Sequence, residues 1–125
     1  MRTGLDLIEI DRLEQLDPSI RRRFLARVFT PAELAQAGDS NPSLAGRFAA
    51  KEAVAKALGT GIGVVHWQDI EILTLASGEP QVHLHGAARL LASDLKLTEW
   101  SLSITHTRNL AAAFVVALAA PEPGA

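Results

Sequence analysis

Hydrophobic and polar side chains alternate at the start of the chain and then change to a helical spacing. Residues 4–10 alternate as in a strand with one buried face. Over residues 11–28 the apolar side chains recur every three or four positions, which predicts a helix, and Pro18 is expected to kink or divide it. The first two elements are therefore predicted to be a strand and a helix in one or two pieces.

Two further helices are predicted before the middle of the chain. Thr30-Pro31-Ala32-Glu33 has the form of a capping box with proline at the first helical position, and it predicts a short helix that runs to about Ala37. Residues 38–43 combine Gly, Asp, Ser, Asn and Pro and are expected to form a surface loop. A longer helix is then predicted over residues 44–58, because Gly59 stops it.

The second half of the chain predicts strands arranged around one more helix. The expected elements are strands at 64–75 and 81–85, a helix at 86–95, and a final hairpin of 100–107 with 110–119. This order predicts an α+β fold with mainly antiparallel pairing. We expect one domain over residues 1–120 and a disordered tail at 121–125.

Composition narrows the classes of function. The chain has 125 residues, 48% of them hydrophobic, and a mean hydropathy of +0.16, so some apolar surface is expected to be buried between copies of the chain. The longest apolar run is too short to span a bilayer, and no membrane partner is expected. A net charge of −2 gives no support to a nucleic-acid partner, and the absence of cysteine fits a cytoplasmic location.

Basic residues are concentrated in the first part of the chain. Arg21, Arg22, Arg23 and Arg27 lie within seven positions of one predicted helix, and Arg12 precedes them. Such a local basic patch suits an acidic partner or phosphate groups.

Asp6 breaks the apolar pattern of the first strand. It shares a strand face with Ile8 and Ile10, and an unpaired carboxylate on such a face is costly. It therefore needs a cation, hydrogen-bond donors or a raised pKa. The structural alternative is that Asp6 caps the following helix or pairs with Arg12.

The predicted central helix carries four charged side chains, Arg47, Lys51, Glu52 and Lys56, among small and apolar residues. Glu52 and Lys56 have the i, i+4 spacing of a surface salt bridge, which is the structural alternative for this pair. With Asp6, Glu52 would supply two hard oxygen ligands, a set that suits Mg²⁺ completed by water and a phosphate-bearing substrate. The cationic side chains would then neutralise the phosphate charge.

His106 and a glycine run complete the candidate residues. His106 ends an apolar row of the final hairpin, where it can bind a phosphate or serve as a structural histidine. Gly59-Thr60-Gly61 follows a helix, so it is most simply a cap and turn, although glycines also let a ligand approach the backbone.

Together these segments resemble the bacterial holo-[acyl-carrier-protein] synthases, the small trimeric class of 4′-phosphopantetheinyl transferases. The resemblance covers nearly the whole chain. It rests on GLDLIEIDR at 4–12, FTPAEL at 29–34, RFAAKEAVAKALGTGI at 47–62, WQDIEI at 67–72, GEPQVHLHG at 78–86 and SLSITHT at 101–107. The last motif departs from the family pattern, because Thr105 stands where the family more often has serine.

The resemblance implies transfer of 4′-phosphopantetheine from coenzyme A to a serine of an apo acyl carrier protein in fatty acid biosynthesis. The implied fold is an antiparallel sheet wrapped around a long central helix, in a homotrimer with active sites between subunits. By the same resemblance, Asp6 and Glu52 match the metal ligands and act in catalysis with Lys56. Contacts with coenzyme A are implied for Arg47, Lys51, Gly59, Gly61, Pro80, His106 and Thr107. Docking of the carrier is implied for Arg12, Arg21, Arg22, Arg23 and Arg27.

Other functions stay open at this point. The same transfer can act on a polyketide or nonribosomal-peptide carrier, since each presents a serine before an acidic helix. A non-catalytic coenzyme-A-binding module would use the basic helix without needing Mg²⁺, and a structural homo-oligomer would use only the apolar surplus.

Overall fold

In a computed structural model, residues 1–121 of the chain are described, and they alternate helices with strands. The elements are β1 (Arg2–Glu9), α1 (Asp11–Glu14), α2 (Pro18–Val28), α3 (Pro31–Ala37), α4 (Asn41–Ala57), the 3₁₀ helix η1 (Trp67–Asp69), β2 (Ile70–Thr74), β3 (Pro80–Leu84), α5 (Gly86–Asp94), β4 (Glu99–His106) and β5 (Leu110–Leu118). Except for Pro121, the predicted tail lies outside the described residues.

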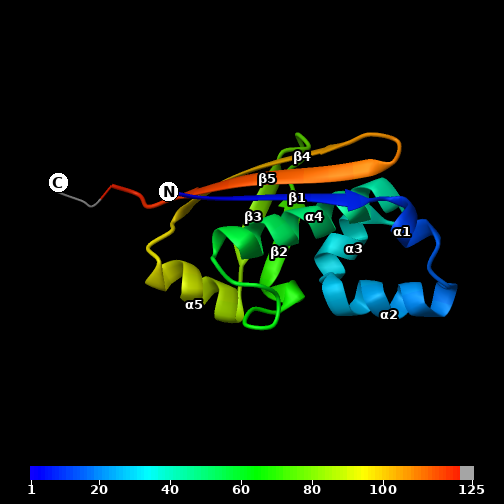
Figure 1. The fold of residues 1–125 in the computed structure, drawn as a ribbon, viewed down its shortest axis with the longest axis horizontal. Coiled ribbons are helices and arrows are strands. Elements are labelled where there is room, and N and C mark those ends of the chain that lie inside the picture. Colours follow the sequence, from blue (N-terminus) through cyan, green and yellow to red (C-terminus); the bar gives the residue numbers. More distant parts are fainter. Residues whose placement is uncertain (122–125) are drawn as a thin grey trace.

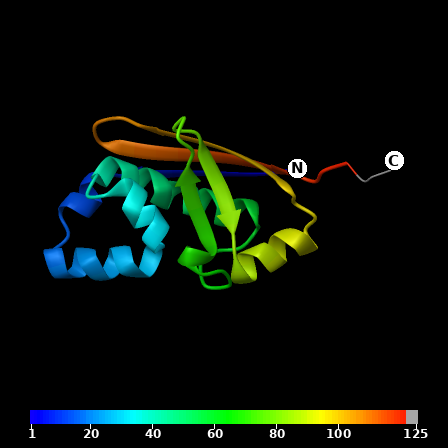
Figure 2. The same ribbon diagram turned by 180° about the vertical axis from the view of Figure 1, so that it is seen from behind.

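The strands form two antiparallel sheets. One has the order β1-β5-β4, and the other is the β2-β3 hairpin. In Figure 1 the three-stranded sheet lies above α4, with α2 and α3 toward one end of the molecule and α5 toward the other. Figure 2 shows the β2-β3 hairpin on the side nearest the viewer, where it passes in front of the long strands and extends below them. The predicted α+β class with antiparallel pairing is confirmed.

Helix α4 packs against β1, β5, β4 and β2, and small side chains make this close packing possible. Ala49, Ala50 and Ala53 are fully buried. A Cβ atom at Gly4 of β1 would lie 1.7 Å from the carbonyl oxygen of Ala53. Because only glycine permits that approach, β1 rests directly on α4.

Local signals at the helix ends agree with the structure at two places. The predicted helix over residues 11–28 is divided, and Pro18 opens α2 behind Asp17, whose side chain accepts a hydrogen bond from Ser19 N. The capping box of α3 is present in both directions between Thr30 and Glu33.

Two predicted boundaries are wrong. The loop expected at 38–43 ends earlier, because Ser40 accepts a hydrogen bond from Ser43 N and starts α4 at Asn41. The strand expected at 64–75 begins only at Ile70, because η1 comes first. Backbone N of His66 donates to the Asp69 carboxylate at 3.1 Å and fixes that short helix.

Candidate active site

Asp6 and Glu52 face each other where β1 crosses α4. Asp6 lies on the face of β1 that it shares with buried Gly4, and Lys56 Nζ is 3.1 Å from Asp6 Oδ1 and 2.9 Å from the carbonyl oxygen of Leu5. Burial, and then the negative charge of Asp6, raise the pKa of Glu52, whereas Lys56 opposes that shift. The two carboxylates therefore share one electrostatic environment.

Neither structural alternative for these acids is found. The N-cap residue of α1 is Ile10, without a side-chain cap, so Asp6 does not cap that helix. Arg12 lies 4.0 Å from Glu9 instead. Among the described residues Lys56 forms its salt bridge with Asp6 rather than with Glu52.

The donor set at this crossing fits a divalent cation that also binds substrate oxygens. Two carboxylates and one ammonium leave a net charge of about −1 when all three are ionised. No third His, Cys, Asp or Glu side chain completes a metal cluster in the described part of the chain. Mg²⁺ accepts such a site, because it commonly keeps waters and binds one or two carboxylates together with phosphate oxygens.

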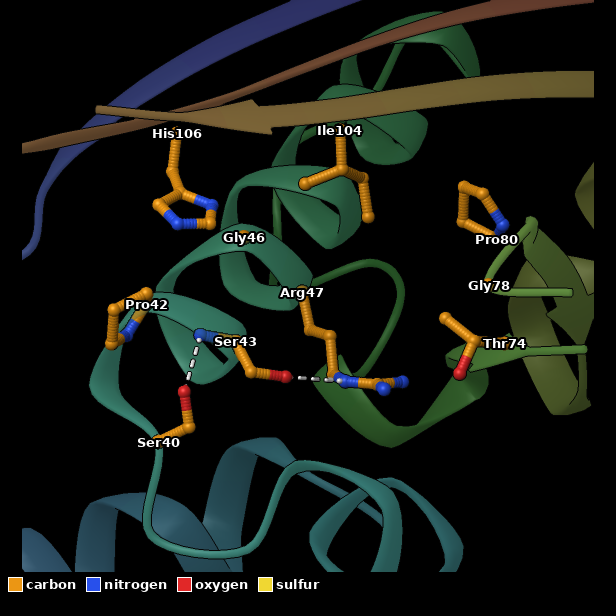
Figure 3. A pocket seen from close by; sticks show the side chains of 10 residues that line it. All are labelled: Ser40, Pro42, Ser43, Gly46, Arg47, Thr74, Gly78, Pro80, Ile104 and His106. Carbon is orange, nitrogen blue, oxygen red and sulfur yellow. Dashed lines mark hydrogen bonds between the residues drawn. The ribbon is translucent and has the colours of Figure 1, made fainter. Parts of the chain in front are cut away.

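A separate cavity of about 390 Å³ opens at the N-terminal end of α4 (Figure 3). It contains three of the predicted ligand-binding residues, Arg47, Pro80 and His106. Its other lining residues are Ser40, Pro42, Ser43, Gly46, Thr74, Gly78 and Ile104. The cationic Arg47 and the positive end of the α4 dipole give this cavity a preference for anions.

The Arg47 side chain crosses from α4 toward β2. Its Nη1 donates to Gln36 Oε1 at 3.1 Å and to the carbonyl oxygen of Ile72, while Nε is 3.5 Å from Ser43 Oγ. Burial lowers the pKa of Arg47 and Glu33 opposes this shift, and a guanidinium stays protonated throughout the working pH range. Arg47 therefore supplies a fixed positive charge to the cavity.

The expectation that Lys51 binds phosphate is wrong. Its side chain is fully buried, and Nζ donates to Glu33 at 2.7 Å, to Trp67 O at 3.0 Å and to Ile70 O at 2.5 Å. These three acceptors use all the donors of an ammonium group. Burial lowers the pKa of Lys51, and Glu33 opposes that shift. Lys51 is a structural residue that joins α4 to α3 and β2.

Three other predicted contacts lie outside the cavity, and two of them, Gly59 and Thr107, have local structural roles. Gly59 has φ = 76° and closes the C-terminal end of α4, so the cap interpretation of the glycine run is confirmed. A Cβ atom at Gly59 would lie 2.2 Å from Arg2, whereas Gly61 has open space around it. Thr107 Oγ1 accepts a hydrogen bond from Leu110 N at 3.1 Å in the β4-β5 turn. None of these three residues lines the cavity.

The predicted site residues thus fall into two groups on one chain. Arg47 and Glu52 are five residues apart on α4, so they are about 140° apart around its axis. Asp6, Glu52 and Lys56 are absent from the cavity lining. A single copy of the chain therefore presents the carboxylates and the cavity on different sides of α4.

The basic residues of α2 form an exposed surface. Arg22, Arg23 and Arg27 are exposed, whereas Arg21 is half-buried and donates to Asn41 at 2.7 Å. Arg23 and Arg27 flank a hollow of about 340 Å³ together with Ile20 and Phe24. This surface combines positive charge with an apolar depression.

Sequence reasoning missed several residues of the cavity. The sequence pattern predicts a loop at Ser40 and Ser43, although a serine two positions before Pro42 is the signature of a helix N-terminus. Thr74 and Ile104 come from strands far apart in sequence, and no local pattern could have joined them to α4.

Comparison with known proteins gives consistent results. The family model described as the 4′-phosphopantetheinyl transferase superfamily matches residues 2–118. The chain is 46% identical to the holo-[acyl-carrier-protein] synthase of Herpetosiphon aurantiacus, over 93% of this chain and 97% of the relative. It is 52% identical to that of Moorella thermoacetica, over 90% of both chains.

Solved structures agree with the sequence comparisons. The crystal structure of the Helicobacter pylori holo-[acyl-carrier-protein] synthase in complex with coenzyme A is 32% identical, with a TM-score of 0.84, and the match covers 93% of this chain and 99% of the other. In the described part of this chain, no helix has the length and apolar character needed to cross a membrane.

Proposed function

The chain belongs to the 4′-phosphopantetheinyl transferase superfamily. On that premise we propose which residues bind the metal ion, which bind coenzyme A and which dock the carrier protein. The chain is a holo-[acyl-carrier-protein] synthase by its relatives, and it transfers 4′-phosphopantetheine from coenzyme A to an apo acyl carrier protein. The carrier serine oxygen forms a bond to the phosphorus that carries the pantetheine arm, and the bond from this phosphorus to the bridging pyrophosphate oxygen breaks. Adenosine 3′,5′-bisphosphate leaves with that oxygen, and the serine hydroxyl gives its proton to the solvent.

The observation that carries the proposed metal site is the pairing of Asp6 with Glu52. Burial, and then the charge of Asp6, raise the pKa of Glu52, and the single Lys56 ammonium beside them leaves one negative charge of the two carboxylates without a partner. Asp6 and Glu52 would hold Mg²⁺, which when bound stabilises the charge of the pyrophosphate oxygens. Lys56 lies against Asp6, and it would contribute its positive charge to the same oxygens.

The cavity would hold the nucleotide part of coenzyme A. Arg47 and His106 would contact its phosphates, and Pro80 would give an apolar surface at the rim. The basic residues Arg12, Arg21, Arg22, Arg23 and Arg27 would dock the acidic surface of the carrier. For Arg21 this requires exchange of its hydrogen bond with Asn41.

We propose that a homotrimer brings the carboxylates of one copy to the cavity of the next. Leu5 and Leu7 on β1 are each 61% exposed, and Phe114 on β5, which pairs with Leu5, is 45% exposed. Such a contiguous apolar sheet face is typical of a surface that another protein covers. Such an assembly would also bring together the carboxylates and the cavity, which lie on different sides of α4 in a single chain.

The proposal is tested by mass spectrometry of apo carriers incubated with the protein, coenzyme A and Mg²⁺. A fatty-acid carrier is expected to gain one phosphopantetheine group, whereas Asp6→Asn and Glu52→Gln should each reduce the rate at least about 100-fold. Asp94→Asn removes an exposed acid at the end of α5 and serves as the control. Full activity of either active-site variant would contradict the metal assignment, and preferential modification of a polyketide or peptide carrier would contradict the fatty-acid assignment.

A further inference from the structure

Gln36 is an exposed residue of α3 whose side chain is nevertheless held on both of its polar atoms. Its Oε1 accepts hydrogen bonds from Arg47 Nη1 at 3.1 Å, from Thr74 N at 2.8 Å and from Thr74 Oγ1 at 3.2 Å. Its Nε2 donates to the carbonyl oxygen of Thr74 at 3.0 Å. An exposed glutamine normally keeps its rotamer freedom, so this degree of constraint needs an explanation.

The explanation lies in the way Gln36 holds one side of the Arg47 guanidinium. Gln36 and the Ile72 carbonyl bind Nη1, the nitrogen that lies on the Cδ side of the planar group. The opposite edge consists of Nε, which makes only a long contact of 3.5 Å with Ser43, and Nη2. Figure 3 shows the guanidinium beside the Ser43 hydroxyl at the wall of the cavity.

The Nη2 atom of Arg47 is accessible. Among the described residues no hydrogen bond engages it, and no buried side-chain nitrogen there lacks a partner. Since Arg47 lines the cavity, its Nε and Nη2 form the edge that can take two oxygens of a phosphate side by side. Rotation of the guanidinium about its long side chain would lose that alignment.

We propose that Gln36 is a positioning residue that fixes the Arg47 guanidinium with its Nε–Nη2 edge toward a phosphate in the cavity. This inference rests on the proposed binding of coenzyme A there. Gln36 itself does not line the cavity, so it acts through Arg47. A purely structural role, in which Gln36 only ties α3 to the end of β2, is the rival explanation.

Binding of coenzyme A by calorimetry, without carrier, separates the two roles. Gln36→Met keeps the length of the side chain and removes its polar atoms, and it is expected to weaken coenzyme A binding about five- to tenfold. Gln68→Met is the matched control, because Gln68 is also exposed and donates to two backbone carbonyls, those of Ala26 and Phe29. Gln68→Met is expected to leave the affinity unchanged.

A double-mutant cycle then tests whether Gln36 acts through Arg47. In an Arg47→Met background, Gln36→Met is expected to change the affinity less than about twofold, because no guanidinium remains to be oriented. Equal effects of Gln36→Met in both backgrounds would overturn the proposal in favour of the structural role. So would an unchanged affinity of the Gln36→Met protein. Gln36→Ala repeats the test if Gln36→Met does not fold.

NMR without ligand distinguishes failure of this inference from failure of the proposed function. The ¹⁵N signal of Arg47 Nε, identified by its loss in Arg47→Met, is expected to exchange at least about tenfold faster with solvent in Gln36→Met than in Gln68→Met. An unchanged exchange rate overturns the positioning role. Faster exchange in a protein whose unsubstituted form does not bind coenzyme A overturns the proposed function instead.

Discussion

Replacement of Lys51 by methionine is expected to destabilise the fold strongly while leaving the affinity for coenzyme A nearly unchanged. The ammonium group joins the buried carboxylate of Glu33 to the backbone carbonyls of Trp67 and Ile70, with no exposed surface on either charged side chain. Methionine fills a similar volume but has no donor. The variant therefore leaves a buried carboxylate and two carbonyls without their shared partner.

The expected loss is about 4 kcal/mol, because removal of one partner of a buried ion pair costs about 3–5 kcal/mol. Unfolding entropy is about 2.1 cal/mol/K per residue, so for 125 residues this loss lowers Tm by about 15 °C. Domains of this size have unfolding free energies of about 5–15 kcal/mol. The Lys51→Met protein is therefore expected to stay folded at low temperature with much reduced stability.

Urea unfolding followed by tryptophan fluorescence measures this loss, at one fixed protein concentration because assembly would also affect stability. The double variant Lys51→Met with Glu33→Met leaves no unpaired charge. Its loss in free energy of unfolding is therefore expected to be smaller, by at least about 2 kcal/mol, than the sum of the losses in the two single variants. A loss below about 1 kcal/mol for Lys51→Met would refute the structural assignment. A coenzyme A affinity more than about tenfold weaker in the folded variant would instead place the ammonium at the ligand.

Three further predictions test the position and charge of the site. Gly4→Ala places a Cβ atom against Ala53 O. It is expected to lower the free energy of unfolding by about 1–3 kcal/mol and to raise the Mg²⁺ concentration needed for half-maximal activity. Unchanged stability and unchanged Mg²⁺ dependence would contradict the contact between β1 and α4. The raised pKa of Glu52 favours the folded state at low pH, and this stability is lost as the pH rises through the folded pKa. Without metal, Glu52→Gln is therefore expected to be more stable than the unsubstituted protein at pH 7, by less than about 1 kcal/mol, with the difference shrinking toward pH 4 in urea titrations. Arg22→Glu with Arg23→Glu is expected to raise KM for the carrier more than it changes kcat, and unchanged steady-state kinetics would place docking elsewhere.

Sequence predicted those elements whose signals are local. The capping box at Thr30 and the hairpin turn between β4 and β5 depend on residues within a few positions of each other, and both are present. The start of α4 at Asn41 was missed because Ser40, Pro42 and their neighbours also suit a loop. The packing of α4 against the sheet decides between loop and helix, and this packing involves residues far from 38–43 in sequence.

Lys51 shows why the site could be predicted only in part. The sequence indicated that the charges of α4 have no broad polar face, which implies that some of them are buried, and a buried cation requires a buried anion. Glu33 supplies that anion, but its position in a capping box already explained its presence. Its Oε1 in fact accepts from both Thr30 N and Lys51, and only the tertiary structure brings the two elements together.

The meeting of Asp6 with Glu52 follows from the matching repeats of a strand and a helix. Arg2 Nε donates to Ala57 O, and Gly4 lies against Ala53, so β1 runs antiparallel to α4. Two residues of a strand advance about 7 Å, which is close to the 5.4 Å of one helical turn. Helical side chains lean toward the N-terminus, so Glu52 and Lys56, one turn apart, both lean toward the next inward residue of β1, which is Asp6. An acid at position 5 or 7 would lie on the opposite face of the strand. An acid one position from 52 would turn by about 100° around the helix, away from the strand. The spacing of the glycine and the acid in β1, and of the acid and the lysine in α4, is thus a requirement of this single crossing.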